Sequence, residues 1–491
     1  MPRRMFPALL ICSSLLALAT PADEMRAAVA DVERLPPEVR PTTRYLTLYA
    51  IAPSQRQDAV KAISYVLNAL SHTRAISQPL LVTPTLVRFS IGQYAPRPDE
   101  FAAWFDAWEK LAELDPYFHL RTQVLVNPDS KLRKPAGNKT AVGISVSSPS
   151  DLKTITTDGG WADPYTAAQL RSATHSVGAL LRADYFIVQA TTTPRYYEFS
   201  GVPDTENDFL KSLGVDRTVI DRLRANAGAN LATSGVTAKP RRIVWAQGPL
   251  GGIYSTLDVE TVDAQRDPLR RPITAAGLAF HYDLGEWFAV APNGLWRTAL
   301  FNSAGHRQDS VPDRVAKDTS DPAGDGIVVP LISCIRCHRE AGLRPFVDDE
   351  TKLLTGRVDL LSPDPNIIGR AVEFYDEPRL NRQMQFDRQT YADAVARATG
   401  GLKPEELAES LATLVRRHAY LPVTLNQAAT EVGLDRNQFQ DVLALTHDPV
   451  ILLLLENQPV LRGQWESSFA EAAFAAQTFF NTVSKKQATS N

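Results

Sequence analysis

The sequence has few cysteines and few methionines, and neither sign of charge dominates. Its 491 residues include 3 cysteines and 4 methionines, and the formal net charge is −3. A chain with this balance has no polycationic surface for neutralising phosphates, so nucleic acid is not expected as a partner. With so few cysteines, a framework of several disulfides is excluded as the basis of the fold.

Long hydrophobic runs are also missing. The most hydrophobic internal run, Val450 to Leu455, is far shorter than the ~20 apolar residues of a membrane-spanning helix. We therefore predict that the chain is not an integral membrane protein. Its 44% hydrophobic and 22% charged residues are typical of folded proteins, and at ~150 residues per domain the length predicts about three folded units.

The first 22 residues predict a cleaved signal peptide and therefore a periplasmic location. Arg3 and Arg4 form a positive start, Phe6 to Leu18 is almost entirely apolar, and small residues that suit cleavage follow. One cysteine, Cys12, lies inside this segment. Only Cys334 and Cys337 then remain in the exported chain, and a disulfide between such close neighbours stabilises a fold little.

The pattern along the chain predicts an α+β multidomain fold. We expect an extended lead-in over 23–42, strands at 45–51 and 185–190, β-structure over 80–91, and helices over 55–71, 99–114 and 165–181. A second set of short strands is expected at 242–245, 252–256, 277–282, 286–291 and 295–301, with a hairpin at Asn293-Gly294. Helices are expected at 388–399, 404–418, 425–432, 436–446 and 465–480. The predicted domains are an N-terminal α/β-type layer over 23–240, a β-rich segment over 241–326, a region over 327–400 that contains Cys334 and Cys337, and a helical region over 401–491.

The motif Cys334-Ile335-Arg336-Cys337-His338 indicates the chemistry of the chain. Positions i, i+3 and i+4 share one face of a helix, so two thiols and an imidazole project together. C-x-x-C-H is the attachment motif of c-type haem, in which the thiols add to two vinyl groups of one porphyrin and the imidazole binds the iron. The sequence therefore predicts one covalent haem c on Cys334 and Cys337, with His338 as the proximal iron ligand. It also makes 327–400 the predicted cytochrome c-like haem-binding region.

Zinc binding and dithiol redox chemistry use the same residue types. A zinc site needs further ligands, but no other cysteine follows the signal segment, and adjacent Cys337 and His338 fit a tetrahedron poorly. A thioredoxin-like pair requires a βαβ context and makes no use of His338. Both alternatives are weaker than haem.

The second axial ligand is left open by the sequence. Met384 is the only methionine beyond the expected lead-in, and its separation from His338 is one that a small cytochrome can use, so it is the tentative distal ligand. His281, His306, His418 and an open or water-bound position are the alternatives. Asp318, at the start of a Gly/Pro loop with Asp321 and Asp325, offers a weak calcium candidate, since the spacing is not that of an EF-hand.

A hydrophobic wall is expected around the haem to exclude water and raise its potential. The residues expected to form it flank the motif on both sides: Val328, Val329, Leu331, Ile332, Leu343 and Phe346.

The chain also resembles a group of exported bacterial multidomain proteins that carry one cytochrome c-like haem motif. The resemblance lies in four stretches: Arg44 to Tyr49, Arg182 to Phe186, Pro292 to Trp296, and Ile327 through His338. It implies a c-type haem protein of the cell envelope and assigns no reaction. We expect one-electron transfer to a redox partner protein, with a peroxidase-like haem enzyme or a haem-based sensor with an open distal site as the alternatives.

Overall fold

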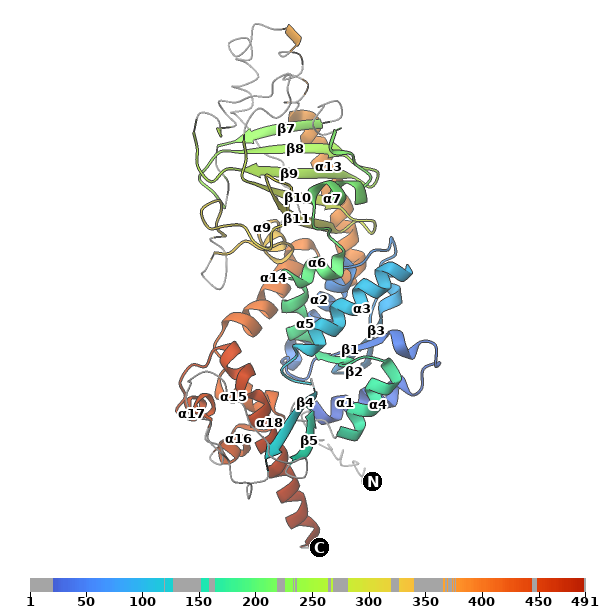
Figure 1. Ribbon diagram of the computed structural model, residues 1–491, viewed down its shortest axis with the longest axis vertical. Coiled ribbons are helices and arrows are strands. Elements are labelled where there is room, and N and C mark those ends of the chain that lie inside the picture. The colour runs from blue at the N-terminus through green and yellow to red at the C-terminus, as the bar shows by residue number, and fades with distance from the viewer. Residues whose placement is uncertain are drawn as a thin grey trace, which may run out of the picture.

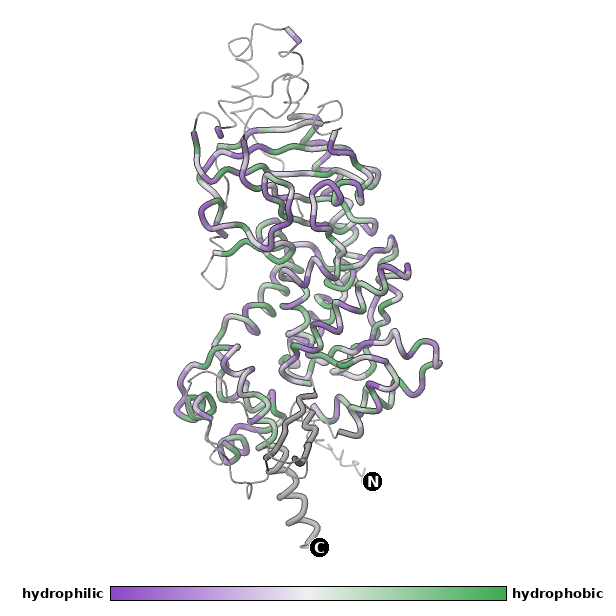
Figure 2. Tube along the Cα trace, viewed as in Figure 1, coloured by the Kyte–Doolittle hydropathy of each residue, from purple (hydrophilic) through white to green (hydrophobic). Residues whose placement is uncertain are grey.

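The computed structural model describes residues 21–118, 120–126, 152–158, 164–218, 226–232, 234, 236–263, 266–267, 281–318, 326–339, 365–366, 369, 373, 375, 377–443 and 448–489. The expected mixture of helices and sheets is confirmed. A five-stranded sheet lies at one end of the elongated molecule and the last helices lie at the other (Figure 1). Among the described residues no helix is both long and apolar enough to cross a membrane, and hydrophobic stretches stay short along the coloured trace (Figure 2).

A four-stranded mixed sheet organises the N-terminal layer. Its order is β2-β3-β1-β6, with β1 antiparallel to β3 and parallel to β6. The strands are β1 (Thr43–Thr47), β2 (Leu80–Thr83), β3 (Leu86–Ser90) and β6 (Leu180–Arg182). The helices of this layer are α1 (Pro21–Val32), α2 (Arg56–Ala69), α3 (Pro98–Glu113), α4 (Pro164–Thr174), α5 (Ala183–Ala190) and α6 (Arg195–Ser200), with 3₁₀ turns at Arg40–Thr42, Pro53–Gln55 and Ile91–Gln93. Strand β1 is buried along its whole length, as a central strand should be.

The second sheet is an antiparallel meander in the order β11-β10-β9-β8-β7. Its strands are β7 (Asn226–Leu231), β8 (Arg241–Gln247), β9 (Gly252–Asp258), β10 (Leu284–Val290) and β11 (Trp296–Asn302). Asn293-Gly294 turns the chain from β10 to β11 as predicted, with Gly294 at φ +91° and the Ala291 amide donating to the Leu295 carbonyl. Helix α7 (Glu206–Ser212) precedes this sheet, and a separate ribbon pairs β4 (Leu120–Val126) with β5 (Leu152–Asp158).

Helices follow the second sheet. They are α9 (Ile332–Cys337), α13 (Glu377–Thr399), α14 (Pro404–Val415), a π-helical turn at Arg416–Tyr420, α15 (Leu425–Glu431), α16 (Arg436–Leu443), α17 (Pro449–Leu455) and α18 (Arg462–Thr489). Helix α13 packs on β7 and β9 and continues to α2, while α14 contacts α2, α5 and α9. These two helices therefore connect the second sheet to the N-terminal layer.

Four local expectations differ from the structure. The helix predicted over 165–181 ends at Thr174 as α4, and its last two residues, Leu180 and Leu181, belong to strand β6. The predicted lead-in over 23–42 begins as helix α1, because its run of alanines with Glu24 and Met25 favours a helix. The predicted strand at 185–190 belongs to helix α5, where Tyr185, Phe186 and Ile187 are all buried and so give no helical periodicity. Strand β7 precedes residue 241, so the second sheet starts before the β-rich segment was expected to begin.

Some expectations lie outside the described residues. These are the signal segment up to residue 20 and nearly all of the strand expected at 277–282.

Candidate functional site

The Cys-x-x-Cys-His motif forms the short helix α9, held at its start by strand β11. Leu331, the residue before the helix, has φ +66°, a conformation that costs a leucine energy. Its amide donates to Thr298 Oγ1 on β11 at 2.9 Å, and its carbonyl accepts from the Ile335 amide at 2.9 Å. The His338 amide closes the turn on the Cys334 carbonyl at 2.8 Å. The predicted helical turn is therefore formed.

An ion pair fixes the other side of α9. Arg336 Nε donates to Asp318 Oδ2 at 2.8 Å, and Asp318 is only 2% exposed. The sequence offered the Asp318 carboxylate as a weak calcium ligand, but in the structure it forms an ion pair with Arg336 of the motif. The other two carboxylates of that candidate, Asp321 and Asp325, lie outside the described residues.

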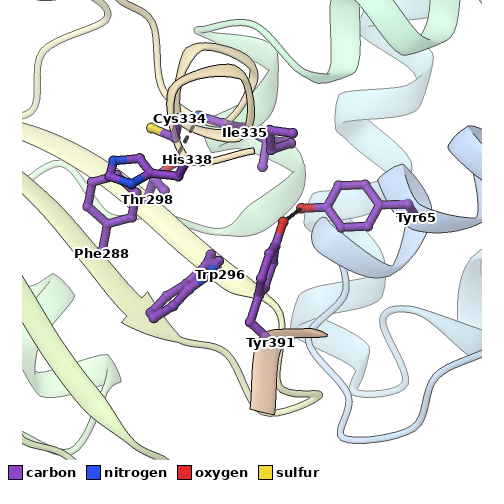
Figure 3. Close-up of a pocket in the computed structure, with 9 residues that line it drawn as sticks. Tyr65, Phe288, Trp296, Thr298, Cys334, Ile335, His338 and Tyr391 are labelled. Carbon is purple, nitrogen blue, oxygen red and sulfur yellow. Dashed lines mark hydrogen bonds between the residues drawn. The ribbon is translucent and has the colours of Figure 1, made fainter. Parts of the chain in front are cut away.

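Helix α9 presents its buried face to a partly open cavity, whose empty space of about 300 Å³ includes solvent at its mouth. Four segments far apart in the sequence meet there (Figure 3). The lining residues come from α2, from β10 and β11, from the region of α9 and from α13: Tyr65, Phe288, Trp296, Thr298, Leu331, Cys334, Ile335, His338 and Tyr391.

Aromatic rings form most of the wall opposite α9. The His338 ring stands edge-on to Phe288, with centroids 4.9 Å apart and planes at 70°. Trp296 lies 5.7 Å from Tyr391, whose hydroxyl is 3.2 Å from that of Tyr65. The cavity therefore combines a histidine with apolar ring faces and a pair of hydroxyl groups.

Both motif cysteines are free thiols; Cys334 is buried and Cys337 is half-buried. Burial, and then the Glu286 carboxyl 3.9 Å from Cys334 Sγ, raise the pKa of Cys334 well above its usual value. Burial, and then Asp318, raise the pKa of Cys337 to about 12. Both groups are therefore protonated at neutral pH, which makes them poor nucleophiles and poor metal ligands. Among the described residues, no cluster of three or more histidine, cysteine or acidic side chains could hold a metal ion.

Of the residues expected to form a hydrophobic wall around the haem, only some line the observed cavity. Leu331 lines the cavity, whereas Ile332 faces a separate small cavity against α14. Val328 packs in a cluster with Leu284 and Leu300, and Val329 packs against the main core. The remaining two expected wall residues, Leu343 and Phe346, lie outside the described residues.

The structure does not bring the candidate distal ligands to this cavity. Met384 is buried on α13, two helical turns before Tyr391, and does not line the cavity. His281 and His306 are exposed, and His418 is buried beside Asp184 in a different part of the molecule.

The residues present suit a covalently attached porphyrin in donor chemistry. Cys334, Cys337 and His338 occupy one helical turn, and flat aromatic faces oppose them. Trp296 Nε1 is buried and makes no hydrogen bond to the described residues, so it is a donor ready for an acceptor on a bound molecule. The cavity is smaller than a whole porphyrin, so part of the ring would extend beyond the described walls or displace side chains.

Comparison with protein-family models, with curated protein sequences and with solved structures gives no match to this chain. The functional argument therefore depends on the residues of the site.

Proposed function

We propose that the chain is a periplasmic c-type cytochrome-like protein that carries one covalent haem and passes single electrons to a redox partner protein. The observation that supports it is the placement of Cys334 and His338 on the wall of an aromatic cavity, with Cys337 on the same turn. Haem c would supply an iron centre that changes by one electron between Fe(III) and Fe(II).

Each residue then has a defined part. Cys334 and Cys337 tether the group, and His338, packed against Phe288, ligates the iron. The rings of Phe288 and Trp296 exclude water, which favours the reduced form and raises the reduction potential. Thr298 accepts a hydrogen bond from the Leu331 amide at the strained start of α9 and so fixes the position of Cys334, Cys337 and His338.

The test is expression of the exported chain in a host with a cytochrome c maturation system. We expect a haem absorption spectrum that persists under denaturing conditions and a mass gain of one haem. Cys334→Ser together with Cys337→Ser should abolish both signals. Cys12→Ser, in the signal segment, is the matched control and should keep them. A colourless mature chain without added mass would overturn the proposal.

A second candidate, a haem enzyme or sensor with an exchangeable sixth ligand, is favoured by one observation. The described side chains that share the cavity with His338 include the Tyr65–Tyr391 hydroxyl pair, while Met384 lies elsewhere. The spectrum of the reduced protein with and without carbon monoxide separates the two candidates. An unchanged spectrum supports electron transfer, and a large shift supports the open site. Peroxide turnover then distinguishes an enzyme from a sensor.

A further inference from the structure

A second, partly open cavity lies between the N-terminal layer and the C-terminal helices, and its empty space of about 490 Å³ includes solvent at its mouth. Its lining is almost wholly polar, and it includes four charged side chains. The lining residues come from the loop after β1, from α5, from the π-helical turn, from α15 and from α18: Ala50, Asp184, Arg417, Asn426, Gln427, Thr430, Glu431 and Arg462. This cavity is separate from the one lined by His338.

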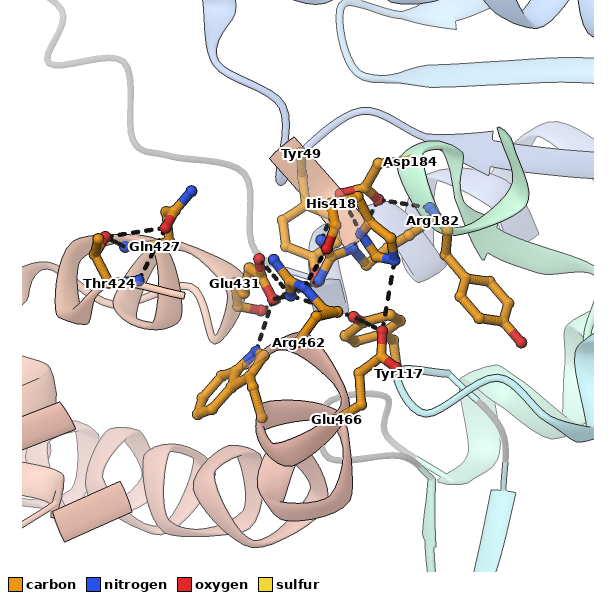
Figure 4. Close-up of polar contacts among 12 residues, drawn as sticks. Tyr49, Tyr117, Arg182, Asp184, His418, Thr424, Gln427, Glu431, Arg462 and Glu466 are labelled. Atoms are coloured by element: carbon orange, nitrogen blue, oxygen red, sulfur yellow. Dashed lines mark hydrogen bonds and ion pairs between the residues drawn. The ribbon is translucent and has the colours of Figure 1, made fainter. Parts of the chain in front are cut away.

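The two carboxylates of the lining are already neutralised by buried guanidinium groups (Figure 4). Arg182 donates to both oxygens of Asp184, at 3.0 and 2.6 Å, and to Glu431 at 2.6 Å. Arg462 Nη1 lies 3.0 and 2.8 Å from the two oxygens of Glu431, and Trp465 donates to the same group at 2.8 Å. These carboxylates therefore add little negative potential for a ligand to overcome.

Arg417, a third arginine at this cavity, has a neutral partner and not a carboxylate. Arg417 Nη1 donates to the neutral amide oxygen of Gln55 at 2.6 Å, so its described hydrogen bond leaves the positive charge uncompensated. Arg462 uses Nε and Nη1 in its described bonds, to the His418 carbonyl, Tyr117 and Glu431, which leaves Nη2 for a ligand. Arg417 lies in a π-helical turn, a distortion that often occurs at functional sites.

We propose that this cavity binds a small organic carboxylate, with Arg417 supplying the uncompensated positive charge and Arg462 Nη2 a further donor. A guanidinium group presents a planar fork that matches a carboxylate and stays charged at every physiological pH. Asn426, Gln427 and Thr430 line the remaining wall and suit hydroxyl or carbonyl groups of the ligand. Among the described residues of the lining, Ala50 is the only apolar one, so an apolar ligand would find little surface to cover there.

The test is titration calorimetry of the full-length mature chain at pH 7 with succinate, tartrate and inorganic phosphate. We expect a carboxylate to bind at one site and Arg417→Gln to weaken that binding about tenfold or more, because a charge-assisted contact is lost. Arg416→Gln is the matched control, since this exposed neighbour does not line the cavity, and should bind normally. Asn426→Asp, at an exposed lining position, should also weaken binding by adding a negative charge.

Three results would overturn the proposal. They are no carboxylate binding up to about 10 mM, binding of phosphate without binding of either carboxylate, and equal affinity in the wild type, Arg417→Gln and Asn426→Asp. The Cys334→Ser/Cys337→Ser chain should bind as the wild type does, so this test is independent of haem.

Discussion

Arg182 and Glu431 are 249 positions apart in the chain, yet Nη1 of the arginine lies 2.6 Å from Oε2 of the glutamate. Both side chains are buried. The arginine ends strand β6 of the N-terminal layer and the glutamate ends helix α15, so the pair joins two distant parts of the fold. Because the pair is shielded from water, its loss should be felt far more than the loss of a surface ion pair.

Glu431→Gln should destabilise the folded chain by roughly 3 kcal/mol, near the lower end of the cost of breaking a buried ion pair. The cost stays near that end because Asp184 still neutralises Arg182, and the glutamine oxygen can still accept a hydrogen bond from Arg462. Urea unfolding followed by circular dichroism measures this difference. The exposed Glu456→Gln is the control and should change stability by less than about 0.5 kcal/mol. Equal effects of the two substitutions would show that the pair does not stabilise the fold.

The same glutamate should make stability depend on pH in the acid range. Arg182 and Arg462 outweigh the effect of burial and lower the pKa of Glu431 from 4.5 to about 2. A lowered pKa in the folded state gives stability that is present above pH 4.5 and is lost as the pH falls towards 2. The free energy of unfolding should therefore fall more steeply between these pH values in the wild type than in Glu431→Gln. Parallel curves for the two chains would contradict this assignment.

Local patterns in the sequence predicted much of the secondary structure. Helix α2 lies within the helix expected over 55–71, and α3 closely matches the one expected over 99–114, because each has a regular apolar face. Asn293-Gly294 specifies its hairpin by turn chemistry alone. The pattern fails for α5, where the apolar residues Tyr185 to Ile187 are buried on several sides and the tertiary context determines the helix.

Only the Cys-x-x-Cys-His turn of the candidate site could be predicted from the sequence. The spacing of Cys334, Cys337 and His338 lies within one turn, so sequence alone places them together. The opposite wall depends on Tyr65 and Tyr391, whose hydroxyl groups meet across 326 positions of sequence. No local signal identifies such a pair.

The motif thiols of the haem-free chain should react slowly with alkylating reagents. Burial and Asp318 raise the pKa of Cys337 to about 12, so at pH 8 very little of it is the reactive thiolate. Mass spectrometry after iodoacetamide treatment should show slow labelling in the native chain and rapid labelling in denaturant. Asp318→Asn should speed native labelling, whereas Asp313→Asn, an exposed control, should not. Labelling at the same rate in native and denatured chains would contradict the protected setting.

If the chain carries the proposed haem, Met384→Leu should leave the absorption spectrum of its oxidised form unchanged. Met384 is buried at 2% exposure on α13, but the cavity with His338 is lined by Tyr391 of the same helix instead. Leucine keeps the apolar volume, so the substitution should cost less than about 1.5 kcal/mol of stability and removes only the thioether. The measurement compares oxidised and reduced spectra of the two chains at neutral pH. If Met384 were an iron ligand, replacing it with leucine would remove the thioether from the iron and shift the spectrum. A shifted spectrum would therefore place Met384 on the iron, and α13 would have to lie closer to the haem than it lies to the His338 cavity in this structure.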